Sequence, residues 1–272
     1  MTEFIQLLWS GILNGMLYAL IGLSLVLIFK TARILNFAAG TMAGFTGWFA
    51  WWWATKQGIP FLLAILVAIV MVAVATLLIE RLTIRPLINE NFLSIVTITL
   101  GLEFLIANLS INFFGGRAES LRIPGDIQFK NFEIAGVRFN WWHVVILIST
   151  FIILAIVGYI VNRTELGLAM RAFAEDKDAA RLMGIKESTV SQWTWTLSVT
   201  VGGLAGILFA PVLFLQQDYM NIPFIKGFVA AILGGFTSLS GGVLGGLLLG
   251  ELEAFAVKYA PRQMAAALPV II

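Results

Sequence analysis

The side chains that could carry out chemistry in this chain are few, and they form no catalytic group. His143 is the only histidine, and the chain has no cysteine. The sequence contains no Gly-Lys-Ser phosphate loop and no cluster of carboxylates with metal-ligand spacing. His143 follows Trp142, a position more typical of an anchor at a membrane surface than of a ligand. We therefore expect no catalytic residue, no metal and no cofactor in this chain, and we do not expect an enzyme.

Among the carboxylates inside apolar runs, Glu103 is the most unusual because it lies near the middle of its run. A charged carboxylate at the centre of a bilayer costs about 2.5–3.5 kcal/mol on insertion scales, so Glu103 should face other helices. Glu103 is either a residue of a transport pathway or proton relay, or a structural hydrogen-bond partner of an amide such as Asn14 or Asn108. Since no basic partner lies within the same run, the structural interpretation is favoured. Glu251 and Glu253 carry the same ambiguity.

The composition indicates that these residues are positioned by helices in a lipid bilayer. Of the 272 residues, 60% are hydrophobic and 12% are charged, and the mean hydropathy is +0.94. A soluble domain carries about 25% charged residues and could not bury so much apolar surface. The net charge of +2 is too small to indicate a nucleic-acid partner. The first apolar run is too long for a cleavable signal peptide and lacks its basic flank.

Apolar runs long enough to cross a bilayer recur along the chain. A crossing helix needs about 20 mostly apolar residues. Six runs meet this length, a Gly-rich stretch follows at Phe224–Val257, and the last run, Met264–Ile272, is too short to cross. We predict a single all-α transmembrane domain over residues 1–272 with an incomplete last helix, and the stretch after residue 224 leaves open one broken crossing, two crossings or a re-entrant hairpin. The six runs are Leu7–Phe29, Leu35–Trp53, Phe61–Leu82, Phe92–Phe114, Trp141–Val161 and Trp193–Leu215.

The distribution of Lys and Arg predicts the orientation of these runs. If the first five runs all cross, one side carries nine basic residues. The other side carries Lys56 and the loop 115–140, whose basic residues are offset by Glu119, Asp126 and Glu133. This bias places the amino terminus outside and the loop 162–192 in the cytoplasm. The nine residues are Lys30, Arg33, Arg81, Arg85, Arg163, Arg171, Lys177, Arg181 and Lys186.

The outer loop 115–140 has the signals of a small capping structure. Residues 122–126 contain Pro-Gly-Asp, a turn signal, and Phe129–Phe139 alternates polar and apolar residues around Gly136. We expect a hairpin over the outer face, which either contacts an extracellular partner or serves as a simple lid.

The loop 162–192 is the longest and most charged segment expected in the cytoplasm. Leu168–Met183 contains neither Gly nor Pro, Gly167 precedes it and Gly184 ends it, as at a helix C-terminus. We predict one or two short helices at the membrane surface. A solvated connector is the simplest interpretation, but the small residues Ala179 and Ala180 also suit a helix that docks into a groove of another protein.

Three motifs resemble those of one transporter family. Residues 171–185, Arg-Ala-Phe-Ala-Glu-Asp-Lys-Asp-Ala-Ala-Arg-Leu-Met-Gly-Ile, resemble the coupling loop of ABC importer permeases of the branched-chain amino acid family. Residues 36–40, Asn-Phe-Ala-Ala-Gly, resemble an element after the first span of that family. Residues 228–235, followed by the Gly-rich 238–250, resemble its late segment. The resemblance therefore covers nearly the whole chain, and it departs at the carboxyl end, where the family has a further full helix.

The resemblance implies a fold, a set of partners and a coupling site. The fold is a helical bundle with broken or re-entrant helices, with Lys258 and Arg262 outside and hence two passes or a hairpin after residue 224. The implied partners are a second permease subunit, identical or different, two ATP-binding subunits and an external solute-binding protein, in a bacterial inner membrane. A cytoplasmic coupling helix would sit in a cleft of the ATPase, with contacts from Arg171, Glu175, Asp176, Ala179, Ala180, Gly184 and Ile185.

Two Gly-rich apolar segments, 36–47 and 234–246, indicate broken helices around a pathway at mid-depth. For the pairs Gly241/Gly245 and Gly242/Gly246 we favour close helix packing, and a re-entrant turn is expected at Thr237–Ser240. The candidate pathway residues are Asn36, Gly40, Glu103, Thr237, Ser238 and Glu253.

Two functions follow from these features. The first is a permease subunit of an ATP-driven importer for branched-chain amino acids or related small polar solutes such as urea or amides. The alternative is a stand-alone proton-coupled transporter in which Glu103 titrates. A membrane-embedded enzyme is disfavoured by the lack of a nucleophile–base pair.

Overall fold

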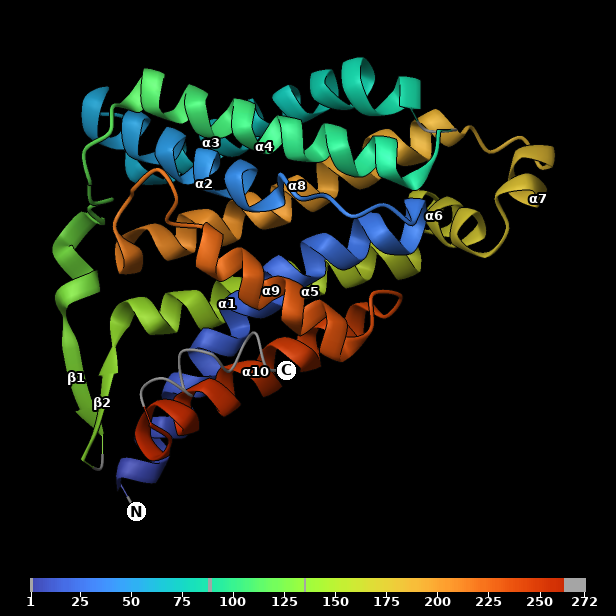
Figure 1. Ribbon diagram of the computed structural model, residues 1–272. Coiled ribbons are helices and arrows are strands. Elements are labelled where there is room, and N and C mark those ends of the chain that lie inside the picture. The colour runs from blue at the N-terminus through green and yellow to red at the C-terminus, as the bar shows by residue number, and fades with distance from the viewer. Residues whose placement is uncertain (1, 88–89, 135, 262–272) are drawn as a thin grey trace.

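Long apolar helices make up most of the chain in the computed structural model, which describes residues 2–87, 90–134 and 136–261. They pack side by side with their axes roughly aligned (Figure 1). Among the described residues, six helices are long and apolar enough to cross a membrane, which confirms the all-α polytopic prediction. They are α1 (Thr2–Ala32), α3 (Phe61–Ile79, continued by helical turns to Leu87), α4 (Phe92–Phe114), α5 (Trp141–Arg163), α8 (Glu187–Leu213) and α10 (Leu239–Tyr259).

Shorter elements complete the bundle and its two ends. Two of them, α2 and α9, are too short to cross by themselves and pack inside the bundle. The shorter helices are α2 (Ala39–Trp51), α6 (Glu165–Glu175), α7 (Lys177–Leu182) and α9 (Asn221–Gly234), the strands are β1 (Asn131–Ile134) and β2 (Val137–Asn140), and the helical turns are Trp52–Lys56, Glu80–Ile84, Arg85–Leu87 and Pro124–Phe129.

The two ends of the bundle differ in structure. One end carries the antiparallel strands β1 and β2 and is called here the hairpin end; the other carries α6 and α7 and is called the α7 end (Figure 1). The hairpin expected in the loop 115–140 is present, and it turns at Gly136, where φ is +80°. The side chain of Gln6 binds the backbone of Arg138, accepting from its N–H at 2.9 Å and donating to its carbonyl at 3.1 Å. The start of α1 is thereby tied to the hairpin.

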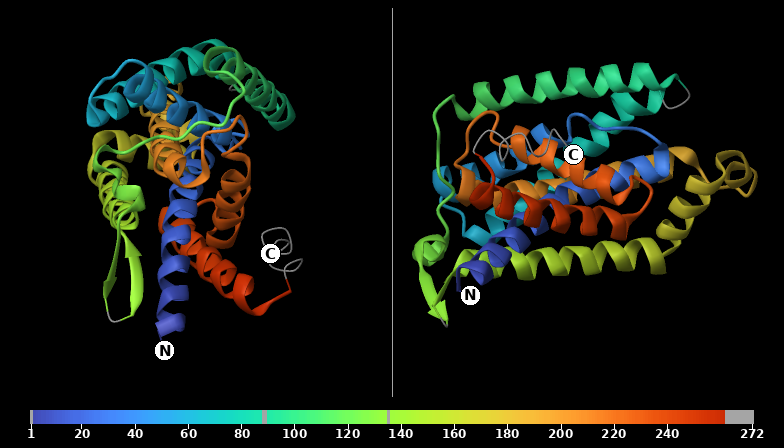
Figure 2. Two further views of the ribbon diagram at one scale, coloured as in Figure 1. Left: turned by 90° about the vertical axis from the view of Figure 1, so that its left-hand side faces the viewer. Right: turned by 60° about the horizontal axis from the view of Figure 1, so that its bottom comes forward.

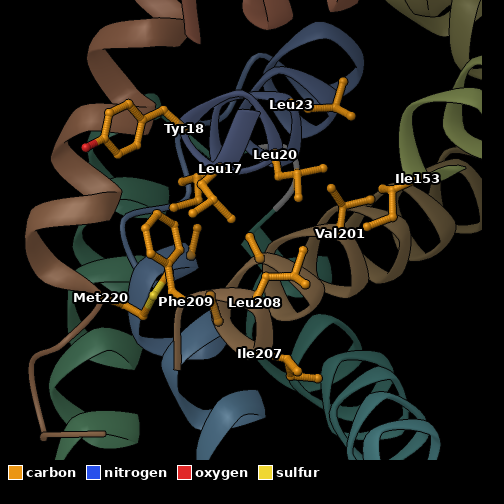
Figure 3. Close-up of a cluster of buried hydrophobic side chains, with 14 of the residues drawn as sticks. Leu17, Tyr18, Leu20, Leu23, Ile153, Val201, Ile207, Leu208, Phe209 and Met220 are labelled. Carbon is orange, nitrogen blue, oxygen red and sulfur yellow. The ribbon is translucent and has the colours of Figure 1, made fainter. Parts of the chain in front are cut away.

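Helix α1 is the central element of the bundle. It contacts α5, α8, α9 and α10, and most of its length is buried. Figure 2 shows it between α5 on one side and α9 with α10 on the other. Leu17, Leu20 and Leu23 of α1 pack against Val201 and Leu208 of α8 in the largest apolar cluster (Figure 3). By contrast, α3, α4 and α5 leave most of their apolar side chains at least partly exposed, as expected of helices that face lipid.

The late glycines make close helix contacts, as the sequence predicts. A Cβ on Gly246 would lie 2.6 Å from the backbone nitrogen of Ala19 in α1, and one on Gly245 would lie 2.1 Å from the Ala230 carbonyl oxygen in α9. The two offset rows of glycines in α10 therefore face two different helices. Helix backbones can approach this closely only where no side chain separates them.

The first helix break lies at residues 33–38, before the glycines of the segment 36–47 that were expected to cause it. Residues 33–38 are non-helical, and they run back along the bundle from the end of α1 before α2 begins (Figure 1). The expected span Leu35–Trp53 is therefore wrong at its start. Gly40, Gly44 and Gly47 lie inside the intact α2, where they allow close contact with Tyr219 and Phe224.

The second break separates α9 from α10. Gly235, with φ of +83°, begins a non-helical turn at residues 235–238, and α10 then packs antiparallel against α9. Of the alternatives for the stretch after residue 224, the structure has two antiparallel helices, of which the first has only 14 residues. The expectation of an incomplete final helix concerns residues 264–272, which lie outside the described part of the chain.

Candidate functional site

The coupling segment, residues 164–187, folds into two short helices that end in well-formed caps. The Thr164 hydroxyl accepts from the Gly167 N–H at 3.2 Å, and the Asp176 carboxylate accepts from the N–H groups of Asp178 and Ala179 at 2.9 and 3.0 Å. Gly184 ends α7 in the left-handed conformation, at φ of +84°. The predicted start after Gly167 is wrong by a turn, because the cap at Thr164 starts α6 at Glu165.

The seven predicted coupling residues divide into two groups by burial. Three hold the segment on the bundle: Ala180 is buried, Ile185 is half-buried, and the half-buried Arg171 donates from Nη1 to the Val161 carbonyl at 2.6 Å. The other four are exposed to solvent, and their contact with an ATPase stays a prediction. These are Glu175, Asp176, Ala179 and Gly184.

The most prominent apolar surface of the segment was missed by sequence reasoning. Leu182 and Met183 at the end of α7 are 89% and 83% exposed. Next to them, Arg181 forms ion pairs with Glu187 at the start of α8 and with Asp178, the latter at 3.4 Å. The sequence signal was a Leu-Met pair directly before Gly184 in the most polar part of the chain.

Asn36 and Gly40 lie where the first non-helical segment enters α2. The Asn36 side chain is buried, and its Oδ1 accepts from the Ala38 N–H at 3.1 Å, which closes the turn. A Cβ on Gly40 would lie 2.8 Å from the Cβ of Phe224 in α9. The contacts of both residues are therefore structural, and neither lines a cavity described below.

Glu103 lies on the peripheral helix α4, away from the other candidate pathway residues. It is half-buried, and no hydrogen bond or ion pair joins it to any residue in the described part of the chain. The expected amide partners are wrong: the Asn108 side chain donates to the Phe104 carbonyl at 2.7 Å, and Asn14 lies on α1. Helices α1 and α4 are not neighbours.

Thr237 and Ser238 belong to the turn between α9 and α10. The Ser238 hydroxyl caps α10 by accepting from the Gly241 N–H at 3.0 Å. Thr237 lines a cavity of about 450 Å³ together with Lys30, Arg33 and Arg171. The turn therefore lies at the α7 end of the bundle, and the expectation of a break at mid-depth is wrong for this segment.

Glu253 takes part in a network that joins three helices. It forms an ion pair with Lys226 of α9, and it accepts a hydrogen bond from the Tyr18 hydroxyl of α1 at 2.8 Å. Lys226 Nζ also donates to the Tyr18 oxygen at 3.0 Å. Lys226 was missed by sequence reasoning, although it is the only basic residue between Phe224 and Val257.

This network lines the polar cavity, a space of about 480 Å³ between α1, α8, α9 and α10. Asp218, in the loop between α8 and α9, lies at its edge and is exposed. Tyr219 of the same loop is buried, and its hydroxyl lies 3.1 Å from the Gly206 carbonyl oxygen and 3.3 Å from that of Gly44. Among the lining residues, the polar ones are Asn14, Tyr18, Gln216, Asp218, Tyr219, Asn221, Lys226 and Glu253, and the apolar ones are Leu17, Phe209, Val212, Leu213, Ile222 and Pro223.

Comparison with known proteins agrees with the motifs. The family described as branched-chain amino acid transport system, permease component, matches residues 7–272. The permease protein BraD of Pseudomonas aeruginosa, from a high-affinity branched-chain amino acid transport system, is 27% identical over 93% of this chain and 86% of its own length. The permease protein LivH of Escherichia coli, from a system of the same description, is 27% identical over 94% and 87%. A probable branched-chain amino acid transport permease of Methanocaldococcus jannaschii is 29% identical over 93% and 81%.

No solved structure matches the chain. The family match extends over almost the entire sequence, and it includes both the coupling segment and the helices around the polar cavity. The chain is therefore a membrane protein that belongs to the family of permease components of branched-chain amino acid transport systems.

Proposed function

We propose that this chain is one of two membrane-spanning subunits of an ATP-driven importer and provides part of the path for branched-chain amino acids or related small polar solutes such as urea or amides. The second permease subunit is identical to this chain or different from it. Two ATP-binding subunits hydrolyse ATP, since this sequence has no phosphate-binding loop. A solute-binding protein delivers the solute to the hairpin end.

The observation that carries this proposal is the exposed apolar end of α7. Leu182 and Met183 are almost fully exposed on a segment that projects from the bundle (Figure 1). A few well-packed, desolvated side chains near the centre of a protein interface typically supply most of its binding energy. We infer that these two side chains enter a cleft of the ATP-binding subunit, with Ala179 and Gly184 allowing close approach beside them.

The contacts of the coupling segment offer a route for motion from the ATPase to the bundle. A Cβ on Gly167 would lie 2.2 Å from the Val161 carbonyl oxygen, so α6 is packed tightly on the end of α5. The ion pair between Arg181 and Glu187 joins α7 to the start of α8. A displacement of α7 would therefore move α5 and α8 together and change access to the polar cavity, which α8 lines.

We place the protein in a bacterial inner membrane with the α7 end in the cytoplasm and the amino terminus outside. The nine basic residues expected on one side lie in or just after the last turns of helices that end at the α7 end, or in α6, α7 and their connections. Cytoplasmic loops carry an excess of Lys and Arg, which supports this orientation.

The test replaces the apolar end of α7 with charge. In the transporter isolated from its host through a tag on this chain, Leu182→Asp with Met183→Asp should release the ATP-binding subunit and abolish ATP-dependent leucine uptake in vesicles. The loss of an interface anchor costs at least about 2 kcal/mol, which is about a 30-fold loss of affinity. Phe129→Asp is the matched control, because Phe129 is 73% exposed at the opposite end.

Two results would contradict the proposal. The first is a double variant that retains both the ATP-binding subunit and ATP-dependent uptake. The second is uptake by this chain alone, in liposomes with a proton gradient and no ATP. If Glu103→Gln abolishes that uptake, the proton-coupled alternative is favoured.

A further inference from the structure

In the network that lines the polar cavity, one N–H donor of Lys226 remains available to a ligand. Both carboxylate oxygens of Glu253 are occupied, one by Lys226 and the other by Tyr18. The Lys226 ammonium has three N–H groups, and the described contacts use two of them, toward Glu253 and Tyr18. Lys226 is therefore held in place by its neighbours and keeps one donor for an anionic group.

A second set of polar groups in the cavity has no partner among the described residues. The Asp218 carboxylate forms no ion pair within the described part of the chain, and the side-chain amides of Asn14 and Asn221 form no hydrogen bond there. An unpaired carboxylate can accept from an ammonium group, and an amide can donate to a carboxylate. The lining thus offers partners for both charges of a ligand.

The balance of charge selects among ligand classes. With Asp218 and Glu253 against Lys226, the lining carries one more carboxylate than ammonium groups. This excess repels a simple anion, and a neutral sugar would leave Asp218 without a charged partner and the remaining Lys226 donor without an anionic acceptor. A zwitterion places one charge beside each, and charge-assisted hydrogen bonds are the stronger ones.

The rest of the lining is apolar and suits an aliphatic side chain. Leu17 and Phe209 are buried, and Val212 and Ile222 lie closer to the opening. In Figure 3 the Tyr18 hydroxyl points away from the apolar cluster to which Leu17 and Phe209 belong. The polar and the apolar side chains therefore occupy different parts of the cavity wall. The volume of about 480 Å³ falls within the range of small-molecule sites.

The short α9 explains why a cavity forms at this depth. With 14 residues, α9 is about 21 Å long, whereas the hydrocarbon core of a bilayer is about 30 Å thick. The loop 214–220 occupies the remaining depth at the hairpin end, where non-helical backbone is tolerated if it lines a polar space. Asp218 in this loop and Lys226 in the second turn of α9 thereby line the same cavity.

We propose that the polar cavity binds a zwitterionic α-amino acid with an aliphatic side chain. Lys226 receives the carboxylate, with the amide of Asn14 or Asn221 as a second donor. Asp218 receives the ammonium group, and Tyr18 and Glu253 act as positioning residues for Lys226. This inference rests on the proposed function and names the groups of this chain that recognise the solute.

The test measures which charge of the ligand each residue recognises. The detergent-solubilised transporter, without its solute-binding protein, is equilibrated with tritiated leucine against leucinamide, which lacks the carboxylate, and 4-methylpentanoate, which lacks the amine. In the unsubstituted protein both analogues should compete about 10- to 100-fold less well than leucine, the effect expected from losing one hydrogen bond to a charged group.

Each variant should remove one discrimination and keep the other. Asp218→Asn should bind leucine and 4-methylpentanoate about equally while still rejecting leucinamide. Lys226→Gln should no longer prefer leucine to leucinamide, but should still prefer leucine to 4-methylpentanoate. Lys226→Arg, which keeps the charge beside Glu253, should restore the preference over leucinamide. Asp126→Asn, exposed at the hairpin end and outside the cavity, is the matched control.

The outcomes separate this proposal from the proposed function. If the ATP-binding subunit co-purifies and ATP-dependent leucine uptake persists, but both analogues compete as well as leucine or the variants leave the discrimination unchanged, the zwitterion site is wrong and the importer stands. If selective binding follows the predicted pattern without an ATP-binding subunit, the site stands and the importer is wrong.

Discussion

A buried carboxylate at the α7 end shows how single residues stabilise the junction of the bundle with the coupling segment. Glu80 is fully buried, and its Oε1 accepts from the Ser191 hydroxyl of α8 at 2.8 Å. Arg85 lies 3.5 Å from its Oε2 and 3.4 Å from the Ser188 carbonyl oxygen. The end of α3 is thus tied to the first turns of α8, next to the residues that connect to α7.

Removing this carboxylate should destabilise the protein. Glu80→Ala leaves the Ser191 hydroxyl without its acceptor and Arg85 without its counter-charge. Breaking a buried ion pair costs about 3–5 kcal/mol, but the Arg85 side chain is 33% exposed and water compensates part of that loss. We therefore expect a loss of about 2 kcal/mol, measured as a lower temperature of thermal unfolding in detergent.

The control for this change is Glu90→Ala. Glu90 is exposed in the same region of the chain, and it forms no ion pair with a described residue. Its replacement should leave the unfolding temperature unchanged. Equal unfolding temperatures for the two variants would show that the buried contact contributes nothing.

At the scale of the elements, the close contact between α1 and α10 depends on glycines, which have no side chain to keep the two backbones apart. A Cβ on Gly250 would lie 2.3 Å from the Gly15 backbone nitrogen and 2.4 Å from the Gly11 carbonyl oxygen. These are backbone atoms, so the clash cannot be relieved by turning a side chain. Glu253, one turn along α10, depends on the same contact for its place beside Tyr18.

Gly250→Ala should therefore force α1 and α10 apart. Overpacking typically costs about 1–3 kcal/mol, and the displacement should weaken leucine binding as well as stability. Gly101→Ala in α4 is the matched control, since a Cβ there meets no atom within 4 Å. That change should be neutral, or should stabilise by up to about 1 kcal/mol. Unfolding in detergent and tritiated leucine binding measure both effects, and two variants that behave alike would contradict this packing.

At the scale of the whole molecule, the absence of cysteine allows a direct test of orientation. Glu90→Cys places a thiol at an exposed position between α3 and α4 at the α7 end, outside the coupling segment, and Lys130→Cys places one at the exposed hairpin end. In intact cells whose outer membrane has been permeabilised, a membrane-impermeant maleimide should label the Lys130→Cys protein and leave the Glu90→Cys protein unlabelled. Inverted vesicles should give the opposite result, and the reverse pattern would place the amino terminus in the cytoplasm.

Much of the architecture could be predicted because helices in lipid satisfy their own backbone hydrogen bonds. Phe92–Phe114 matches α4 at both ends, and the hairpin around Gly136 lies where the residue alternation placed it. The short helices of the coupling segment were predictable because helix-forming residues run up to Gly184, which acts locally as a C-terminal cap. The cap at Asp176, which divides them into α6 and α7, was seen only in the structure. The start of α2 was not predictable, because residues 33–38 are apolar enough to continue a helix and lose it only through the turn at Asn36.

The sequence by itself determined that the chain crosses a membrane several times, which loop carries its charge, and which family it resembles, since these depend on composition and on short motifs. Only the tertiary structure decided which polar residues meet. Tyr18, Lys226 and Glu253 are far apart in the chain, and they form one network because rows of glycine allow α1, α9 and α10 to pack closely. Glu103 appeared equally promising in the sequence but lies on the outer helix α4. Which helix faces which neighbour depends on packing across the bundle, and no local pattern encodes that arrangement.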